Sequence, residues 1–160
     1  MLTRTPLPFR HPAIWLATWF GAGLLPKAPG TWGSLAALPF AWAISEAGGG
    51  GLLAAAVALV SVVGWWAAER YAKASGDGDP GPVVIDEVAG QWLVLTMVPP
   101  GLAGYALGFV LFRLFDIVKP WPVSWADRQL KGGLGIMLDD LLAGLYGLAV
   151  LALLRLWWPI

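Results

Sequence analysis

The sequence predicts an all-α protein of the polytopic integral membrane class: a helical bundle with short hairpins and one charged cytoplasmic face. Of the 160 residues, 58% are hydrophobic and 12% are charged, about half of the charged fraction typical of soluble domains. Long apolar runs alternate with segments that contain nearly all of the charged residues. We therefore expect a single membrane-embedded domain over residues 1–160, in which water is not the only solvent.

Five apolar runs are the predicted helices of this bundle. Each is apolar around its whole circumference, unlike a surface helix of a soluble protein. A complete membrane span needs about 20 residues, so only the second and fifth runs are long enough without added flanking residues. The runs are Leu35 to Ser45, Leu52 to Ala68, Val88 to Val98, Leu102 to Phe112 and Leu141 to Trp158.

Two short uncharged connections, Ala47 to Gly51 and Pro99 to Gly101, predict the turns of two helical hairpins. If both hairpins return, the charged segments share one side of the membrane. That side then contains nine of the ten basic residues, all except Arg155, and the excess of lysine and arginine assigns it to the cytoplasm. The three segments are residues 1–34, 69–87 and 113–140.

Composition also excludes several classes of function. Ten basic residues balance ten acidic ones, so the charge gives no reason to expect a nucleic-acid partner. The absence of cysteine excludes disulfides, a thiolate nucleophile and sulfur-ligated zinc. The single His11 has no serine and acid arranged around it, which argues against a triad. The stretch from Ala13 to Leu25 has some features of a signal peptide, but its aromatic residues favour an interfacial helix.

Five acidic residues stand at the predicted ends of apolar helices: Asp86, Glu87, Asp116, Asp139 and Asp140. Helix capping explains one acid per helix. It explains adjacent acids less well, because neighbouring like charges repel unless a cation is present. Magnesium, a hard cation that prefers oxygen ligands, meets that need. Acidic residues at a membrane edge are functional by default, so metal binding is the favoured interpretation.

Basic residues lie close to one of these acids. Arg113 precedes Asp116 by three residues and shares its helical face, and Lys119 stands just before the helix-breaking Pro120. Arginine and lysine beside a carboxylate can bind a phosphate that a metal also holds. Equally, Arg113 can extend to the interface paired with Asp116 while Lys119 binds anionic headgroups. The residues alone leave both interpretations open.

Glycine-rich segments provide two further candidate sites. The string "PKAPGTWGS" places Thr31 and Ser34 before an apolar helix, where backbone donors could bind an anion or a side chain could cap the helix. In "KGGLGIMLDD" the glycines either admit a headgroup or form a tight turn. The string "DGDPG" from Asp77 to Gly81 lacks the remaining ligands of a calcium loop and is interpreted as a polar surface loop.

Three strings, taken together, resemble the bacterial phosphatidylglycerophosphatase A family. They are "GAGLLPKAPGTWGSLAALP", "DEVAG" and "FRLFDIVKPWPVSWADRQLKGGLGIMLDDLLAG", they occur in order, and they cover most of the chain. The resemblance implies magnesium-dependent hydrolysis of phosphatidylglycerophosphate to phosphatidylglycerol and inorganic phosphate. It also implies a multi-pass protein of the bacterial cytoplasmic (inner) membrane, surrounded by membrane lipids, with its active site facing the cytoplasm.

The resemblance assigns a role to each candidate residue. It implies catalytic residues Asp86, Glu87, Asp116, Asp139 and Asp140, substrate-phosphate contacts from Thr31, Ser34, Arg113 and Lys119, and magnesium ligands Asp86, Glu87, Asp139 and Asp140. A water activated by the metal and a carboxylate is the simplest nucleophile, and an aspartyl-phosphate through Asp116 or Asp139 is the alternative.

Two other classes of function compete with a phosphatase. A small ion transporter or channel subunit would use the paired carboxylates as a cation path, but its acids should be spread through the depth of the membrane. A noncatalytic scaffold held by glycine packing, for example at Gly104 and Gly108, would not need two adjacent acids. The phosphatase interpretation explains the charged residues most completely.

Overall fold

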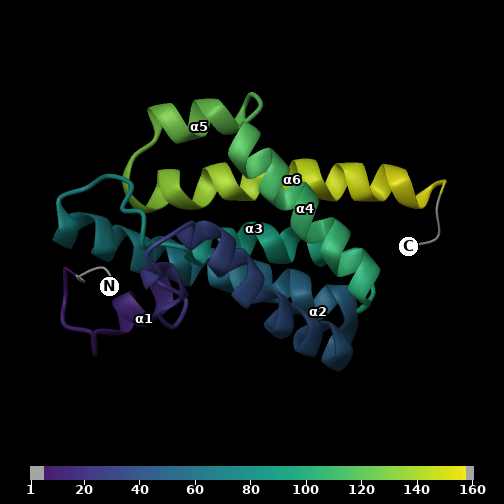
Figure 1. The fold of residues 1–160 in the computed structure, drawn as a ribbon, viewed down its shortest axis with the longest axis horizontal. Coiled ribbons are helices and arrows are strands. Elements are labelled where there is room, and N and C mark those ends of the chain that lie inside the picture. Colours follow the sequence, from purple (N-terminus) through teal and green to yellow (C-terminus); the bar gives the residue numbers. More distant parts are fainter. Residues whose placement is uncertain (1–5, 158–160) are drawn as a thin grey trace.

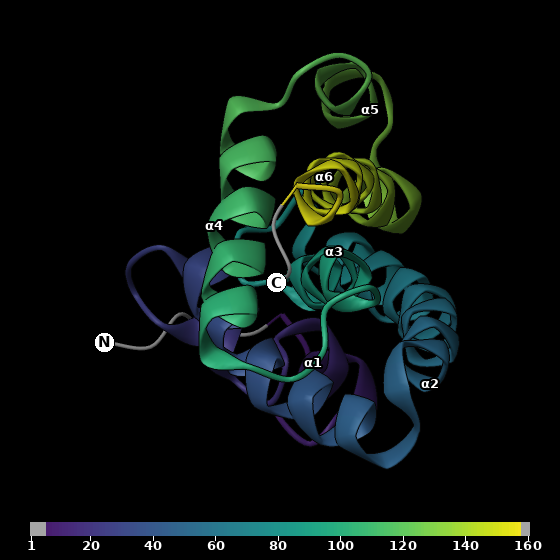
Figure 2. The ribbon, with the colours of Figure 1, turned by 90° about the vertical axis from the view of Figure 1, so that its right-hand side faces the viewer.

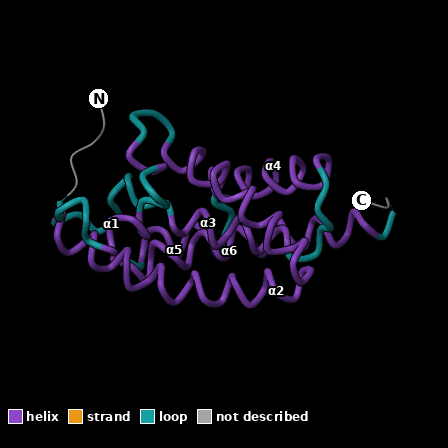
Figure 3. Tube along the Cα trace, turned by 90° about the horizontal axis from the view of Figure 1, so that it is seen from below, coloured by secondary structure: helices purple, strands orange, loops and turns teal. Residues whose placement is uncertain are grey.

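The computed structural model describes residues 6–157, which contain helices and no strand. Figure 1 shows the helices following one another along the chain, and the trace in Figure 3 confines the loops to the connections between them. The structure therefore confirms the prediction of an all-α fold. The elements are α1 (Pro12–Ala17), the 3-10 helix η1 (Ala22–Leu24), α2 (Pro29–Ser75), α3 (Ile85–Leu95), α4 (Leu102–Val118), α5 (Val123–Gln129) and α6 (Gly132–Arg155).

Both predicted hairpin turns are present. The long element α2 is interrupted at Gly48 and Gly49, which have non-helical backbone angles, and the chain turns back at this point (Figure 1). Gly49 has a φ of 67°, a left-handed conformation that costs glycine little. The second turn joins α3 to α4, and α4 begins directly after Gly101.

The shortest of the core helices, α3, lies at the centre of the bundle. It contacts α2, α4 and α6, and Figure 2 shows it end-on between them. Val88, Trp92 and Leu95 are buried on it. The Trp92 indole Nε1 donates to the Ala37 carbonyl oxygen at 2.9 Å, so this bulky side chain is buried without an unsatisfied donor.

Two helices, α2 and α6, are long and apolar enough to cross a membrane. The sequence predicts spans in the same two regions. However, α6 begins at Gly132, nine residues before the apolar run that starts at Leu141. The expectation that the acidic pair stands at the start of a helix is therefore wrong, because Asp139 and Asp140 lie inside α6.

Helix α6 extends this far because its glycines fit tightly against α2. A methyl group added at Gly133 would lie 2.4 Å from the Trp65 carbonyl oxygen, too close for any side chain. The Gly133 N–H donates to the Glu69 carboxylate at 2.7 Å, which satisfies one of the unpaired donors at the start of α6.

The expectation of one interfacial helix from Ala13 to Leu25 is also wrong. Helix α1 ends at Ala17, and Trp19 and Phe20 adopt positive φ angles of 45° and 55° before η1 begins. The Trp19 ring is buried and packs edge-on against Trp92 at 5.6 Å between centroids. The energy of this aromatic packing explains how the left-handed backbone is maintained.

Candidate active site

Three carboxylates, two of them buried and one half-buried, meet where α3 and α6 cross. Asp86 and Glu87 lie in the first turn of α3, and Asp140 lies two turns into α6. One carboxylate oxygen from each lies within 4.8 Å of the others. Asp86 is 8% exposed and Asp140 is 3% exposed. Ionised groups this close and this far from water repel one another strongly unless a cation is bound.

A pair of glycines brings these acids together. Gly90 and Gly144 each lie four residues, or about one helical turn, after an acid of the cluster. A methyl group added at Gly144 would lie 2.7 Å from the Gly90 carbonyl oxygen, and one at Gly90 would lie 2.6 Å from the Asp140 carbonyl oxygen. Because neither position has room for a side chain, the two backbones approach closely and place the acids of α3 opposite Asp140.

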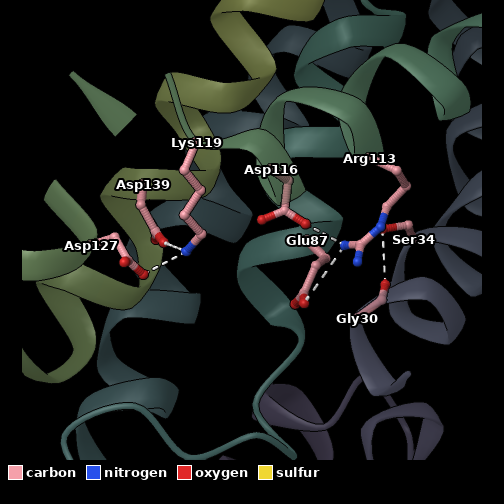
Figure 4. A network of polar contacts seen from close by, with 8 residues as sticks. All are labelled: Gly30, Ser34, Glu87, Arg113, Asp116, Lys119, Asp127 and Asp139. Atoms are coloured by element: carbon pink, nitrogen blue, oxygen red, sulfur yellow. Dashed lines mark hydrogen bonds and ion pairs between the residues drawn. The ribbon is translucent and has the colours of Figure 1, made fainter. Parts of the chain in front are cut away.

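Arg113 of α4 lies beside the carboxylate cluster. Its guanidinium forms an ion pair with Asp116 at 2.5 Å and lies 4.0 Å from the Glu87 carboxylate, as Figure 4 shows. This arrangement confirms that Arg113 and Asp116 share a helical face. The arginine is largely shielded from solvent, with a side chain 16% exposed, and it also faces a second acid, so it does more than extend towards the interface.

The start of α2 packs against the same arginine. A methyl group added at Gly30 would collide with the Glu87 carboxylate and lie 3.1 Å from the Arg113 Nη1 atom. Because Gly30 has no side chain, both groups can lie against the start of α2. Ser34 is buried, and its hydroxyl donates to the Gly30 carbonyl oxygen at 2.9 Å (Figure 4). Thr31 is half-buried in the same turn, where its N–H donates to the Ala28 carbonyl oxygen.

Lys119 forms a second charged group with two carboxylates. Its ammonium lies 2.5 Å from Asp127 and 2.8 Å from Asp139 (Figure 4). Partial burial by itself lowers the pKa of Lys119, but the hydrogen bonds to Asp127 and Asp139 outweigh that effect and raise the pKa above its usual value. The lysine is therefore charged at any physiological pH. It ends α4 with a φ of 48°, and this left-handed turn leads the chain into α5.

Asp139 is adjacent in sequence to Asp140 but has different partners. One of its oxygens accepts from Lys119, whereas the other is buried without a hydrogen-bond partner among the described residues. Asp116 and Asp139 both interact electrostatically with Asp140, so the lysine group and the carboxylate cluster are parts of one site. The structure thus brings the five predicted acids together and separates Asp139 from the closest trio.

The structure adds residues that sequence reasoning missed. Asp127 holds Lys119, and Asp79 of the "DGDPG" loop lines a small cavity with Asp127 and Asp139. The sequence predicts this loop to lie on the surface. Asp79 is indeed exposed, but it faces the site. Gln91 is fully buried one turn after Glu87, and neither its amide oxygen nor its nitrogen has a partner among the described residues. The sequence contains one signal for Gln91, since it is a polar residue inside the apolar run from Val88 to Val98.

The carboxylate cluster fits a divalent cation. Asp86, Glu87 and Asp140 each have one buried carboxylate oxygen that accepts no hydrogen bond within the described part of the chain. Capping does not account for them, because the N-cap of α3 is Val84 and no side chain caps that helix. Hard cations prefer such oxygen ligands, and a cation would remove the repulsion between the three acids. The site therefore combines a candidate metal position with an arginine able to bind an oxyanion.

Known relatives of this chain define its class as a phosphatase. It is 39% identical to "Phosphatidylglycerophosphatase A" of Escherichia coli strain K12 over 160 residues, covering 99% of this chain and 92% of the relative. It is 36% identical to "Phosphatidylglycerophosphatase A" of Haemophilus influenzae over 148 residues, covering 92% and 91%. The sequence profile of phosphatidylglycerophosphatase A matches residues 15–155. The chain belongs to the phosphatidylglycerophosphatase A family.

A third relative has a different name. It is the "Putative phosphatidylinositol-3-phosphatase" of Bacteroides thetaiotaomicron, 39% identical over 155 residues and covering 89% of this chain and 92% of the relative. No solved structure matches the chain significantly. The resemblance inferred from the three sequence strings is therefore confirmed, and the enzyme is a phosphatase.

Proposed function

We propose that this enzyme hydrolyses the terminal phosphate monoester of phosphatidylglycerophosphate at the membrane interface, giving phosphatidylglycerol and inorganic phosphate. The observation that carries the proposal is the carboxylate trio Asp86, Glu87 and Asp140. Their oxygens lie within 4.8 Å of one another, and an arginine lies 4.0 Å from Glu87. A phosphate monoester dianion resists attack by water, so its hydrolysis requires neutralised charge and an aligned nucleophile. The site contains groups for both tasks.

The trio would hold the metal, for which we propose Mg²⁺ because all of the available donors are carboxylate oxygens. When bound, Mg²⁺ would supply positive charge to the phosphoryl oxygens and acidify a nearby water. Asp139 lies next to the trio and keeps one oxygen without a partner among the described residues. We assign Asp139 to the outer edge of the metal site, with its orientation fixed by Lys119.

Arg113 would bind the oxygens of the transferring phosphoryl group. A guanidinium has five donors, so the ion pair with Asp116 leaves others for the substrate, and the Arg113 Nε atom is buried without a partner among the described residues. Lys119 has three donors, two of which face Asp127 and Asp139. The third would be available to a phosphate oxygen, and Thr31 and Ser34 would shape the wall at the start of α2.

In the reaction, a water oxygen attacks phosphorus in line with the bond to the glycerol oxygen. The new P–O bond forms as that bond breaks, and one carboxylate of the site takes the proton lost by the water. The proton taken from the water is then passed to the departing glycerol oxygen, so that phosphatidylglycerol and phosphate leave with atoms and charge balanced. Arg113 and Lys119 would stabilise the charge on the phosphoryl oxygens during the transfer.

We further propose that the protein is multi-pass in the cytoplasmic membrane of a bacterium, with the charged end of the bundle facing the cytoplasm. Two long apolar helices support membrane insertion, and the distribution of lysine and arginine along the sequence supports the orientation. A cation path, the competing function, is not favoured because the acids gather at one site rather than along the bundle.

The direct test is phosphate release by the purified protein in detergent from phosphatidylglycerophosphate, with and without Mg²⁺. We expect release that requires Mg²⁺ and stops when EDTA is added. Because one relative is named for a phosphoinositide, a phosphatidylinositol phosphate should be assayed in parallel. Metal-independent release, or release from the phosphoinositide alone, would overturn the proposed reaction.

A further inference from the structure

An apolar groove runs between the first half of α2 and helix α4. Its volume is about 730 Å³, and its walls include Leu35, Leu38 and Trp42 of α2 and Tyr105, Ala106 and Val110 of α4. The Tyr105 hydroxyl, a polar atom in this lining, is paired with the Ser45 hydroxyl at 3.4 Å. The lining is mostly aliphatic and aromatic, so the groove offers a surface suited to hydrocarbon.

One end of the groove meets the candidate active site. On α4, Val110 lies three residues, less than one turn, before Arg113; on α2, Leu35 directly follows Ser34. The groove walls thus continue, on both helices, from the residues placed around the phosphate.

Two aromatic rings join the two walls of the groove. The rings of Trp42 and Tyr105 lie 5.1 Å apart between centroids and join the two walls. At 1.5 Å per residue, the distance along α2 from Gly30 to Trp42 is about 18 Å, and that along α4 from Arg113 to Tyr105 is about 12 Å. The groove therefore follows both helices away from Arg113, and the Trp42 and Tyr105 rings form part of its lining.

Close packing of α4 elsewhere explains why the groove is open. Gly108 lets α4 approach α3, since a methyl group there would lie 2.7 Å from the Leu95 side chain. The opposite side of α4, which includes Ala106 and Val110, has no such partner and is exposed. The small Ala106 side chain deepens the groove where a larger residue would fill it.

We infer that this groove binds one acyl chain of the glycerophospholipid substrate while the phosphate lies at Arg113 and the carboxylate trio. The inference rests on the proposed lipid phosphatase function and adds a site for the tail. Continuity with the candidate active site favours the substrate's own chain over an unrelated lipid or a second copy of this protein. The groove would orient the phosphate for attack, because it fixes the direction in which the bound lipid extends from the site.

The test uses water-soluble phosphatidylglycerophosphate analogues with short acyl chains of increasing length, assayed as monomers. In the wild type, kcat/KM should rise by up to about fourfold per methylene removed from water and level off when the groove is full. Ala106→Trp, which fills the groove, should flatten this dependence while leaving kcat/KM for the shortest analogue unchanged. Ala58→Trp, at an exposed position of α2 away from the groove, is the matched control and should behave like the wild type.

Each outcome separates the two proposals. If the wild type and Ala106→Trp showed the same dependence on chain length, the proposed binding of an acyl chain in the groove would be wrong. It would also be wrong if the wild-type kcat/KM did not depend on chain length, and the groove would then be assigned to bulk lipid or a second copy of the protein. Absence of phosphate release from every analogue by the wild type would instead refute the proposed function. If Ala106→Trp does not fold, Ala106→Leu should give the same flattening to a smaller degree, and an unchanged slope in that variant would refute the groove.

Discussion

The contact between Gly90 and Gly144 should control the activity of this phosphatase without contacting the substrate. In Gly144→Ala, the new Cβ atom would lie 2.7 Å from the Gly90 carbonyl oxygen and 3.1 Å from the Gly90 Cα atom. Comfortable contacts between such atoms are about 3.5 Å or longer. Helices α3 and α6 must therefore separate by roughly 1 Å, a distance that is enough to lower a rate by up to about 100-fold.

The same substitution should lower stability only moderately. Overpacking of this kind costs about 1–3 kcal/mol, which leaves a folded protein in which the three carboxylates are too far apart to share a cation. We expect turnover to fall by about 10- to 100-fold and Mg²⁺ affinity, measured by calorimetry, to fall with it. Circular dichroism and thermal melting would establish that the helices persist.

Gly51→Ala is the matched control, because Gly51 likewise lies in a helix, here α2, and a methyl group added there would have no atom within 4 Å. It should retain full activity and affinity. If Gly144→Ala kept wild-type turnover and Mg²⁺ affinity in a folded sample, the glycine contact would not set the geometry of the site, and our account of how the acids are brought together would be wrong.

The remaining predictions concern the charged residues and the topology. Asp140→Asn should lower Mg²⁺ affinity and turnover together. Asp139→Asn should lower turnover with a smaller loss of Mg²⁺ affinity, because Asp139 is held by Lys119. Identical losses of affinity, measured by calorimetry, would contradict this distinction. Arg113→Lys should lower kcat by on the order of 100-fold, even at saturating substrate in mixed micelles, because an ammonium cannot reproduce the planar guanidinium fork. An unchanged kcat would show that Arg113 does not bind the phosphoryl group and would favour a role at the lipid interface. Single cysteines at exposed Gln129 and Ala47 should be labelled from opposite sides of sealed vesicles, and labelling from one side would refute the first hairpin as a membrane crossing.

The sequence by itself determined the class of fold and identified most of the residues from which the candidate site is built. Apolar runs and uncharged glycine or proline turns are local features, so they were sufficient to predict the apolar core helices and both hairpins, but not the bounds of α6 or the short helices α1 and α5. The acids were identifiable because a carboxylate beside an apolar helix is costly unless it has a function. Arg113 and Asp116 were predicted to share a face because their spacing of three residues fixes this within one helix.

Tertiary structure decided which of these groups share a site. The adjacent Asp139 and Asp140 point to different partners, because successive residues on a helix lie about 100° apart around its axis, and only the packing of α5 and α3 determines what each one meets. The positions of Asp127 and Gln91 likewise depend on contacts between helices that are distant in sequence. Even the start of α6 followed from the fit of Gly133 against α2, a steric contact that no local pattern contains.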